Sequence, residues 1–196
     1  MNTSTSLPIV LASTSPYRKE LLQRTGIDFK TVAPDVDESS LPGESPENLV
    51  KRLAEAKARV IGKTCEALII GSDQVAVSGD EILGKPGSHE NALVQLRKLS
   101  GKLVTFQTGL CLLNSTSNEM QVDTVPFRVQ FRKLDEQQIE RYLRADQPYN
   151  CAGSFKSEGL GITLFERMDG DDPTALIGLP LIRLTSMLMQ AGVVLP

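Results

Sequence analysis

Two long runs of β-strand character, residues 103–113 and 121–134, constrain the fold of this chain more than any other feature. In the second run Phe127, Val129 and Phe131 alternate with polar residues, so one face of this strand is apolar and the other is cationic. Further strands are predicted at residues 7–12, 68–70 and 162–165. With helices expected between these strands, the sequence predicts a mixed α/β protein.

Capping residues mark where the predicted helices begin. Ser15 and Ser45 are each followed by proline, which is favoured at the first helical position, and Asp135 with Gln138 forms a capping box. Two further helices are predicted, one from Ser88 to about residue 101 and one at about residues 181–191. The apolar stripe of the helix after Ser45 consists of Leu49, Leu53, Ala56 and Val60. Lys57 falls at the border of this stripe, so it can lean toward the protein.

The composition is that of an ordinary globular protein, with 40% hydrophobic and 23% charged residues. The length of 196 residues suits one core, and we expect residues 1–196 to form a single domain. A net charge of −3 argues against a broadly basic surface, although a local basic pocket for a phosphate ester is compatible with it. Arg128 and Arg132 lie on one strand without stacking aromatics, which is typical of a solvated face. We therefore expect no nucleic-acid partner.

The cysteines favour neither a disulfide framework nor a zinc site. Cys65, Cys111 and Cys151 are odd in number and far apart, and no histidine is spaced for zinc, so we expect reduced thiols in the core. The N-terminus lacks the cationic start and long apolar run of a signal peptide, and no apolar run is long enough to span a bilayer. These observations predict a cytoplasmic protein with no membrane partner.

Asp73 is the first candidate for chemistry, because it is one carboxylate inside the apolar run that begins at Leu68. An unpaired charge is costly to bury, so Asp73 needs a partner or a task. With Lys57 and Lys85 nearby, it could bind a metal or deprotonate a water while the lysines neutralise phosphate oxygens. A purely structural ion pair between Asp73 and a lysine is the alternative, because structural networks also perturb acids.

The predicted helix start after Ser15 is the second candidate. Unpaired N–H groups at a helix N-terminus, together with the hydroxyl of Ser13 and the side chain of Arg18, would suit a phosphate or a carboxylate. A simple helix cap with surface cations is the alternative. The segment lacks the glycine spacing of a Walker loop and of a dinucleotide fingerprint.

The third candidate is the acidic loop at residues 35–38, which ends in Glu38. Mg²⁺ takes oxygen ligands and often uses only one or two protein carboxylates, so Glu38 and Asp73 would suffice. A solvated acidic loop is the alternative. The sole histidine, His89, lies just inside a predicted helix, which favours a surface residue and excludes histidine-dependent triads. One hydroxyl-rich helix start, two acids and several cations are the set required for phosphoryl chemistry on a magnesium nucleotide.

Several separated motifs together resemble the Maf family of nucleoside triphosphate pyrophosphatases. They are LASTSPYRKELL from residue 11, the acid pair 37–38, EAKA at 55–58, IIGSDQV from residue 69, GKP at 84–86, AGSFKSEGLG from residue 152, and LFE at 164–166. The resemblance follows the order of nearly the whole chain. It implies a Maf/Ham1 (ITPase-like) α/β fold, in which helices flank a twisted mixed β-sheet and a cleft lies between two lobes.

The resemblance also implies an activity and a set of site residues. Family members hydrolyse a nucleoside triphosphate to the monophosphate and pyrophosphate with a divalent metal, Mg²⁺ or Mn²⁺, and are often homodimers. The family's proton acceptor falls on Asp73 and its acidic metal-linked position on Glu38. Its phosphate-contacting positions fall on Ser13, Arg18, Lys57 and Lys85.

Three departures from the commoner family sequence concern the substrate. Tyr17, Gln74 and Glu158 together resemble the branch of the family that acts on 7-methyl-GTP rather than on dTTP and UTP. The methylated base is cationic, so stacking on Tyr17 could contribute about 0.5–2 kcal/mol, and the Glu158 carboxylate could add attraction. A glutamate also accepts hydrogen bonds from ordinary guanine, so it argues for guanine more than for methylation. A pyrophosphatase for another non-standard or pyrimidine nucleotide and a non-catalytic nucleotide-binding regulator of cell division are the alternatives.

Overall fold

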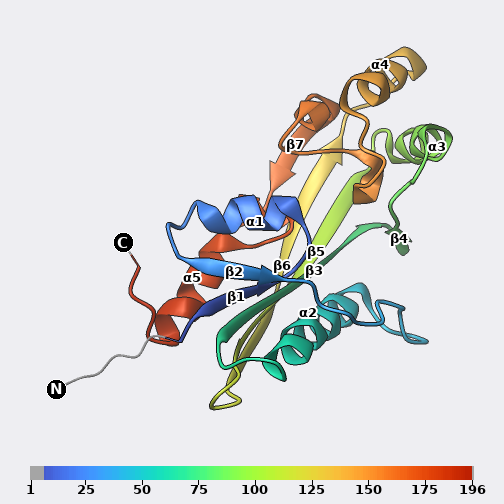
Figure 1. The fold of residues 1–196 in the computed structure, drawn as a ribbon. Coiled ribbons are helices and arrows are strands. Elements are labelled where there is room, and N and C mark those ends of the chain that lie inside the picture. The colour runs from blue at the N-terminus through green and yellow to red at the C-terminus, as the bar shows by residue number, and fades with distance from the viewer. Residues whose placement is uncertain (1–6, 196) are drawn as a thin grey trace.

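A computed structural model describes residues 7–195 of the chain. Its centre is a seven-stranded mixed sheet in the order β2-β1-β3-β5-β6-β7, with β4 paired to β3 (Figure 1). The strands are β1 (Ile9–Ala12), β2 (Phe29–Val32), β3 (Leu68–Ser78), β4 (Glu81–Leu83), β5 (Leu103–Asn114), β6 (Met120–Phe131) and β7 (Phe165–Asp169). The strand β1 is parallel to β2 and β3, whereas the pairs formed by β3, β5, β6 and β7 are antiparallel.

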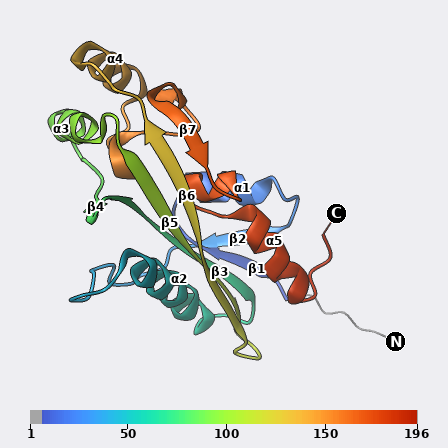
Figure 2. The same ribbon diagram turned by 180° about the vertical axis from the view of Figure 1, so that it is seen from behind.

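Helices cover both faces of this sheet. The α-helices are α1 (Pro16–Gln23), α2 (Pro46–Gly62), α3 (His89–Leu99), α4 (Glu136–Asp146) and α5 (Leu181–Gln190), and three 3-10 helices are η1 (Ala152–Ser154), η2 (Leu160–Leu164) and η3 (Pro173–Ile177). Figure 1 and Figure 2, seen from opposite sides, show α3 and α4 together at one end of the long strands, away from α2 and α5. The predicted α/β class, with helices flanking a twisted mixed sheet, is confirmed. No helix within residues 7–195 is long and apolar enough to cross a membrane.

Alternation along the central strands divides the core between the two faces. Leu68 and Ile70 pack in the cluster that includes α1 and α5, whereas Ile69 packs in the cluster that includes α2. A third cluster, built around α3, α4 and the far ends of β5 and β6, forms the second lobe. The same alternation continues along β3, so Asp73 lies on the α2 side and Ser72 and Gln74 on the other.

Two glycines let α2 lie directly on the backbone of the sheet. A β-carbon at Gly71 would lie 2.1 Å from the carbonyl oxygen of Ala54, and one at Gly109 would lie 2.1 Å from that of Val50. Any larger residue at either position would therefore push the helix away. This close approach brings Lys57 of α2 to β3.

Four features of the structure differ from those predicted from the sequence. The strand β2 was not predicted, because three of its four residues are exposed and its sequence lacks an apolar alternation. The strand predicted at 162–165 is a 3-10 helix up to Leu164, and β7 starts at Phe165.

The apolar stripe of α2 is rotated from the predicted one, because Ala56 and Val60 are only half-buried and Lys57 lies within the buried face. Only Cys111 is a core thiol, since Cys65 is exposed and Cys151 is half-buried.

Candidate active site

A cleft of about 850 Å³ opens between the two lobes. The structure brings together all the residues that the sequence predicts for the site, and all of them line this cleft: Ser13, Tyr17, Arg18, Glu38, Lys57, Asp73, Gln74, Lys85 and Glu158. They come from the β1–α1 turn, the first turn of α1, the loop before α2, α2 itself, β3, the segment after β4, and the loop before η2. The roles assigned to them stay predictions.

The centre of the cleft is an ammonium held between two carboxylates. The Lys57 Nζ lies 2.6 Å from the Asp73 Oδ1 and 2.6 Å from the Glu38 Oε1. Lys57 and Asp73 are buried, with relative exposures of 5% and 8%, whereas the Glu38 side chain is 61% exposed. The structural ion pair proposed as an alternative for Asp73 therefore exists, and it lies inside the cleft where the chemistry is expected.

Positive charge surrounds Glu38. The hydrogen bond from Lys57 lowers the pKa of the Glu38 carboxyl below its ordinary value, and the charges of Lys57, Lys85 and Arg18 lower it further, although burial opposes them. Lys85 itself is exposed on the segment that follows β4. Three cations thus lie close enough to affect one carboxyl, which makes this end of the cleft suitable for a polyanion.

Arg18 is held in place by the backbone of the second half of the chain. Its Nε donates to the Gly178 carbonyl oxygen at 2.8 Å, and the Ser72 hydroxyl donates to the same oxygen at 2.8 Å. Burial lowers the pKa of the Arg18 guanidinium, whereas the charges of Asp73 and Glu38 raise it. A guanidinium still keeps its proton in proteins, so Arg18 is a fixed cation in the cleft.

The helix start beside Arg18 is a cap and part of the cleft at once. The Ser15 hydroxyl accepts a hydrogen bond from the Arg18 N–H at 3.4 Å, which makes Ser15 the N-cap of α1. The buried Ser13 hydroxyl accepts from the Ser15 N–H at 3.1 Å. The two interpretations of this segment, a helix cap and part of the candidate binding site, are therefore compatible.

A second group of residues in the cleft is acidic and aromatic rather than cationic. Tyr17 is half-buried, and burial raises the pKa of its hydroxyl, with the charges of Cys151 and Glu158 raising it further. Glu158 is exposed at the opening of the cleft, where the Ser157 hydroxyl donates to its Oε2 at 3.2 Å. The cleft thus has a cationic end around Arg18, Lys57 and Lys85, and an acidic end around Tyr17 and Glu158.

Gln74 links β3 to β5 and to η3 beside the cleft. Its amide nitrogen donates to the Thr108 hydroxyl at 3.0 Å, to the Ala175 carbonyl at 2.6 Å and to the Leu176 carbonyl at 3.2 Å. These bonds fix η3 against the sheet. The amide donors of Gln74 are consequently engaged with the protein, while the residue also lines the cleft.

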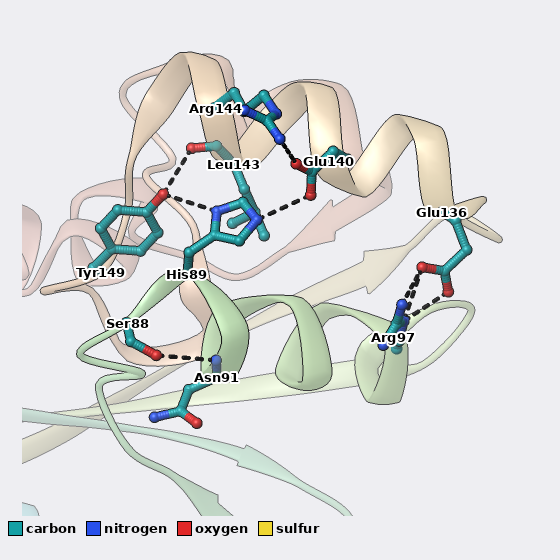
Figure 3. A network of polar contacts seen from close by, with 9 residues as sticks. All are labelled: Ser88, His89, Asn91, Arg97, Glu136, Glu140, Leu143, Arg144 and Tyr149. Atoms are coloured by element: carbon teal, nitrogen blue, oxygen red, sulfur yellow. Dashed lines mark hydrogen bonds and ion pairs between the residues drawn. The ribbon is translucent and has the colours of Figure 1, made fainter.

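The single histidine does not line this cleft, and it is half-buried rather than the surface residue that the sequence favours. Figure 3 shows His89 between α3 and α4, with its Nδ1 3.1 Å from the Tyr149 hydroxyl and its Nε2 2.9 Å from the Glu140 Oε2. The ring therefore ties the two helices of the second lobe together. Likewise, Arg128 lies 3.5 Å from Asp169 on an exposed face.

Comparison with known proteins identifies the family. The family model described as Maf-like protein matches residues 8–191. This chain belongs to the Maf family. Many curated Maf-family relatives are similar over nearly their full length. A protein of Nitrosococcus oceani named 7-methyl-GTP pyrophosphatase is 63% identical over 185 residues, covering 94% of this chain and 93% of the relative. A protein of Pseudomonas aeruginosa with the same name is 56% identical over 189 residues, which cover 96% of this chain and 98% of the relative.

A solved structure supports the fold. The Ham1 protein of Staphylococcus aureus is similar with a TM-score of 0.54 and 13% sequence identity, covering 94% of this chain and 99% of the other. At this identity the likeness concerns the fold alone. The predicted Maf/Ham1 fold is thereby confirmed.

The donor set of this Maf-family chain suits a metal that arrives with its nucleotide. No group of three or more potential metal ligands occurs within residues 7–195. Glu38 and Asp73 provide two carboxylates that both contact the Lys57 ammonium. Mg²⁺ uses one or two carboxylates together with substrate phosphates, so the pair fits Mg²⁺ or Mn²⁺ if the triphosphate supplies further ligands.

Three contributors to the Maf-family cleft are not predicted from the sequence. They are Cys151, which lines the cleft beside Tyr17, and Ser72 and the carbonyl of Gly178, which orient Arg18. Gly178 has a φ of 112°, a conformation that favours glycine, and this glycine before Leu-Pro is the one signal that could have indicated a turn here. The contact itself spans 160 positions of sequence, so no local pattern predicts it.

Proposed function

We propose that this chain is a nucleoside triphosphate pyrophosphatase that hydrolyses 7-methyl-GTP to 7-methyl-GMP and pyrophosphate. The observation that carries the proposal is the division of one cleft into a cationic end with a buried Lys57–Asp73 pair and an acidic end with Tyr17 and Glu158. The names of near full-length relatives support it.

In this proposal the cationic end binds the triphosphate. Arg18, Lys57 and Lys85 neutralise the phosphate oxygens, and they stabilise the charge that develops on the pyrophosphate as it leaves. Lys57 gives up its contact with Glu38 more readily than its contact with Asp73, because the exposed Glu38 is easily solvated. The ammonium thereby becomes free to face phosphate while Asp73 stays in place.

Asp73 would then act on the attacking water. The water oxygen forms a bond to the α-phosphorus, its proton passes to the Asp73 carboxylate, and the α–β bridging P–O bond breaks with its electron pair leaving on pyrophosphate. General-base catalysis of this kind is worth roughly 10²–10⁴-fold. A divalent cation held by Glu38 and Asp73 would polarise the phosphate oxygens.

The acidic end would select the base. The face of Tyr17 offers a cationic 7-methylguanine about 0.5–2 kcal/mol of cation–π attraction. Glu158 would accept hydrogen bonds from the N–H groups on the Watson–Crick edge of the base. Gln74 contributes by holding η3, and with it the Gly178 carbonyl that orients Arg18.

A substrate panel tests the proposal. The protein is incubated with Mg²⁺ or Mn²⁺ and with 7-methyl-GTP, GTP, UTP or dTTP, and both pyrophosphate and the nucleotide product are identified. We expect pyrophosphate and 7-methyl-GMP, with the highest kcat/KM for 7-methyl-GTP. Release of single phosphate would indicate a phosphatase, and binding of nucleotides without any turnover would favour the regulator.

A matched pair of variants ties the activity to the cleft. Asp73→Asn should lower turnover by about 100-fold or more, whereas Asp169→Asn should not change it, because Asp169 lies on β7 with a 59% exposed side chain. Full activity of Asp73→Asn would remove the general base from the mechanism.

A further inference from the structure

Asp146 lies beside the acidic end of the cleft but does not line it. It is the last residue of α4, where the helix dipole disfavours a negative charge. Its Oδ2 is buried and has no hydrogen-bond partner among the residues that the structure describes. Both the position at the helix C-terminus and the unpartnered oxygen lower the stability of the fold, so folding does not explain this carboxylate and a functional role is considered.

The loop that carries Glu158 rests on Asp146. A β-carbon at Gly159 would lie 2.9 Å from the Asp146 Oδ1 and 3.1 Å from its Oδ2. The loop is also fixed to α4, because the Lys156 Nζ donates to the Asp146 backbone carbonyl at 2.6 Å and the Lys156 N–H donates to the Tyr142 hydroxyl at 3.1 Å. The Asp146 carboxylate thus lies immediately behind the backbone next to Glu158.

The charge of Asp146 extends to the lining of the cleft. Burial raises the pKa of the Tyr17 hydroxyl, and the charges of Cys151, Glu158 and Asp146 raise it further. Burial likewise raises the pKa of the Cys151 thiol, with Glu158 and Asp146 adding to the rise and Lys156 opposing it. Two acids and one lysine therefore act on this end of the cleft, and their summed charge is negative.

We propose that Asp146 is a specificity residue, whose carboxylate acts through space to favour a cationic, N-alkylated purine over the neutral purine beside Tyr17 and Glu158. Because the buried Asp146 Oδ2 has no hydrogen-bond donor among the described residues, its charge is not offset there by a protein donor. Lys156 moderates the same field with the opposite sign. The inference rests on the proposed function only for the place where the base binds.

Binding of nucleoside monophosphates tests this role without metal or turnover. The probes are 7-methyl-GMP and GMP, and the measured quantity is the ratio of their dissociation constants by calorimetry. Asp146→Asn keeps the size of the side chain and removes its charge, so the preference for 7-methyl-GMP should fall by about threefold or more. Lys156→Gln removes the opposing charge, so the preference should rise by a similar factor.

The opposite signs separate an electrostatic role from a structural one. If Asp146 and Lys156 only support the loop that carries Glu158, both variants displace Glu158 and either shift the ratio in the same direction or leave it unchanged, and either result would overturn the proposal. Equal affinity of the wild-type protein for the two ligands would also overturn it. If Asp146→Asn does not fold, the direction of the Lys156→Gln change decides. Asp169→Asn is the matched control and should leave the ratio unchanged.

Pyrophosphate release from 7-methyl-GTP is measured on the same preparations. A wild-type protein that prefers 7-methyl-GMP but releases no pyrophosphate would contradict the proposed function and leave the role of Asp146 standing. Pyrophosphate release by the wild-type protein, together with a preference for 7-methyl-GMP that is the same in Asp146→Asn, would support the proposed function and contradict the role of Asp146.

Discussion

Replacing Lys57 by methionine tests the buried ion pair at the centre of the cleft. Methionine retains most of the aliphatic stem but removes the ammonium that lies 2.6 Å from both Asp73 and Glu38. Because Asp73 is only 8% exposed, its carboxylate would lose its nearest counter-charge while most of its surface stays buried beneath the cleft. We expect the variant to fold with reduced stability.

The magnitude follows from the unequal burial of the two carboxylates. Removing one partner of a buried pair costs about 3–5 kcal/mol, whereas an exposed contact such as that with Glu38 contributes about 0–1 kcal/mol. The charge of Arg18 still reaches Asp73, so the lower end of the range applies. Lys57→Met should therefore reduce the free energy of unfolding by about 3 kcal/mol, and Glu38→Gln by less than about 1 kcal/mol.

Urea denaturation followed by circular dichroism at pH 7 measures these differences. The double variant Lys57→Met/Asp73→Asn removes both charges, so it should be more stable than the sum of the two single losses predicts, by about 2 kcal/mol. A loss below about 1 kcal/mol for Lys57→Met, or strict additivity in the double variant, would refute the view of a buried, coupled pair.

Three further outcomes are expected. Asp73→Asn should lower kcat by about 100-fold or more in single-turnover measurements while calorimetry without divalent metal finds nucleotide affinity nearly unchanged, and a parallel loss of metal-free affinity would indicate that Asp73 maintains the cleft rather than acting as a base. Gly71→Ala should lower the free energy of unfolding by about 1–3 kcal/mol in thermal melts, because its β-carbon would meet the Ala54 carbonyl; a neutral effect would mean that α2 is not seated on β3. Hydrogen bonds from Arg52 and the backbone lower the pKa of Glu44 from 4.5 to about 2, so its stabilising contribution is full above pH 4.5 and is lost as the pH falls toward 2. Unfolding of Glu44→Gln should accordingly differ from wild type at pH 7 and converge with it near pH 2, and a constant difference would contradict the assignment.

Much of the cleft could be predicted because several of its residues are charged although their sequence neighbours are apolar. Asp73 is an acid in an apolar run, and Lys57 is a cation next to an apolar stripe. Strand alternation then fixes the face on which Asp73 lies, and the close packing of α2 on Gly71 supplies its partner. Capping serines with prolines likewise defined the starts of α1 and α2.

Other features depend on contacts that no local pattern encodes. The strand β2 (Phe29–Val32) lies at an edge of the sheet and is largely exposed, so it has no apolar alternation to reveal it. The segment before β7 is apolar but forms a 3-10 helix. The sequence predicts a strand there, because periodicity alone does not distinguish a strand from a helix in a short apolar run. Asp146 is an unremarkable acid in the sequence, and only the fold places it behind Gly159.

The site of bond cleavage tests the central claim most directly. Hydrolysis of 7-methyl-GTP in ¹⁸O-labelled water, followed by mass spectrometry of both products, shows which phosphorus the water attacks. If Asp73 directs water at the α-phosphorus, the label appears in 7-methyl-GMP and none in pyrophosphate. Label in pyrophosphate or in free phosphate would contradict the account.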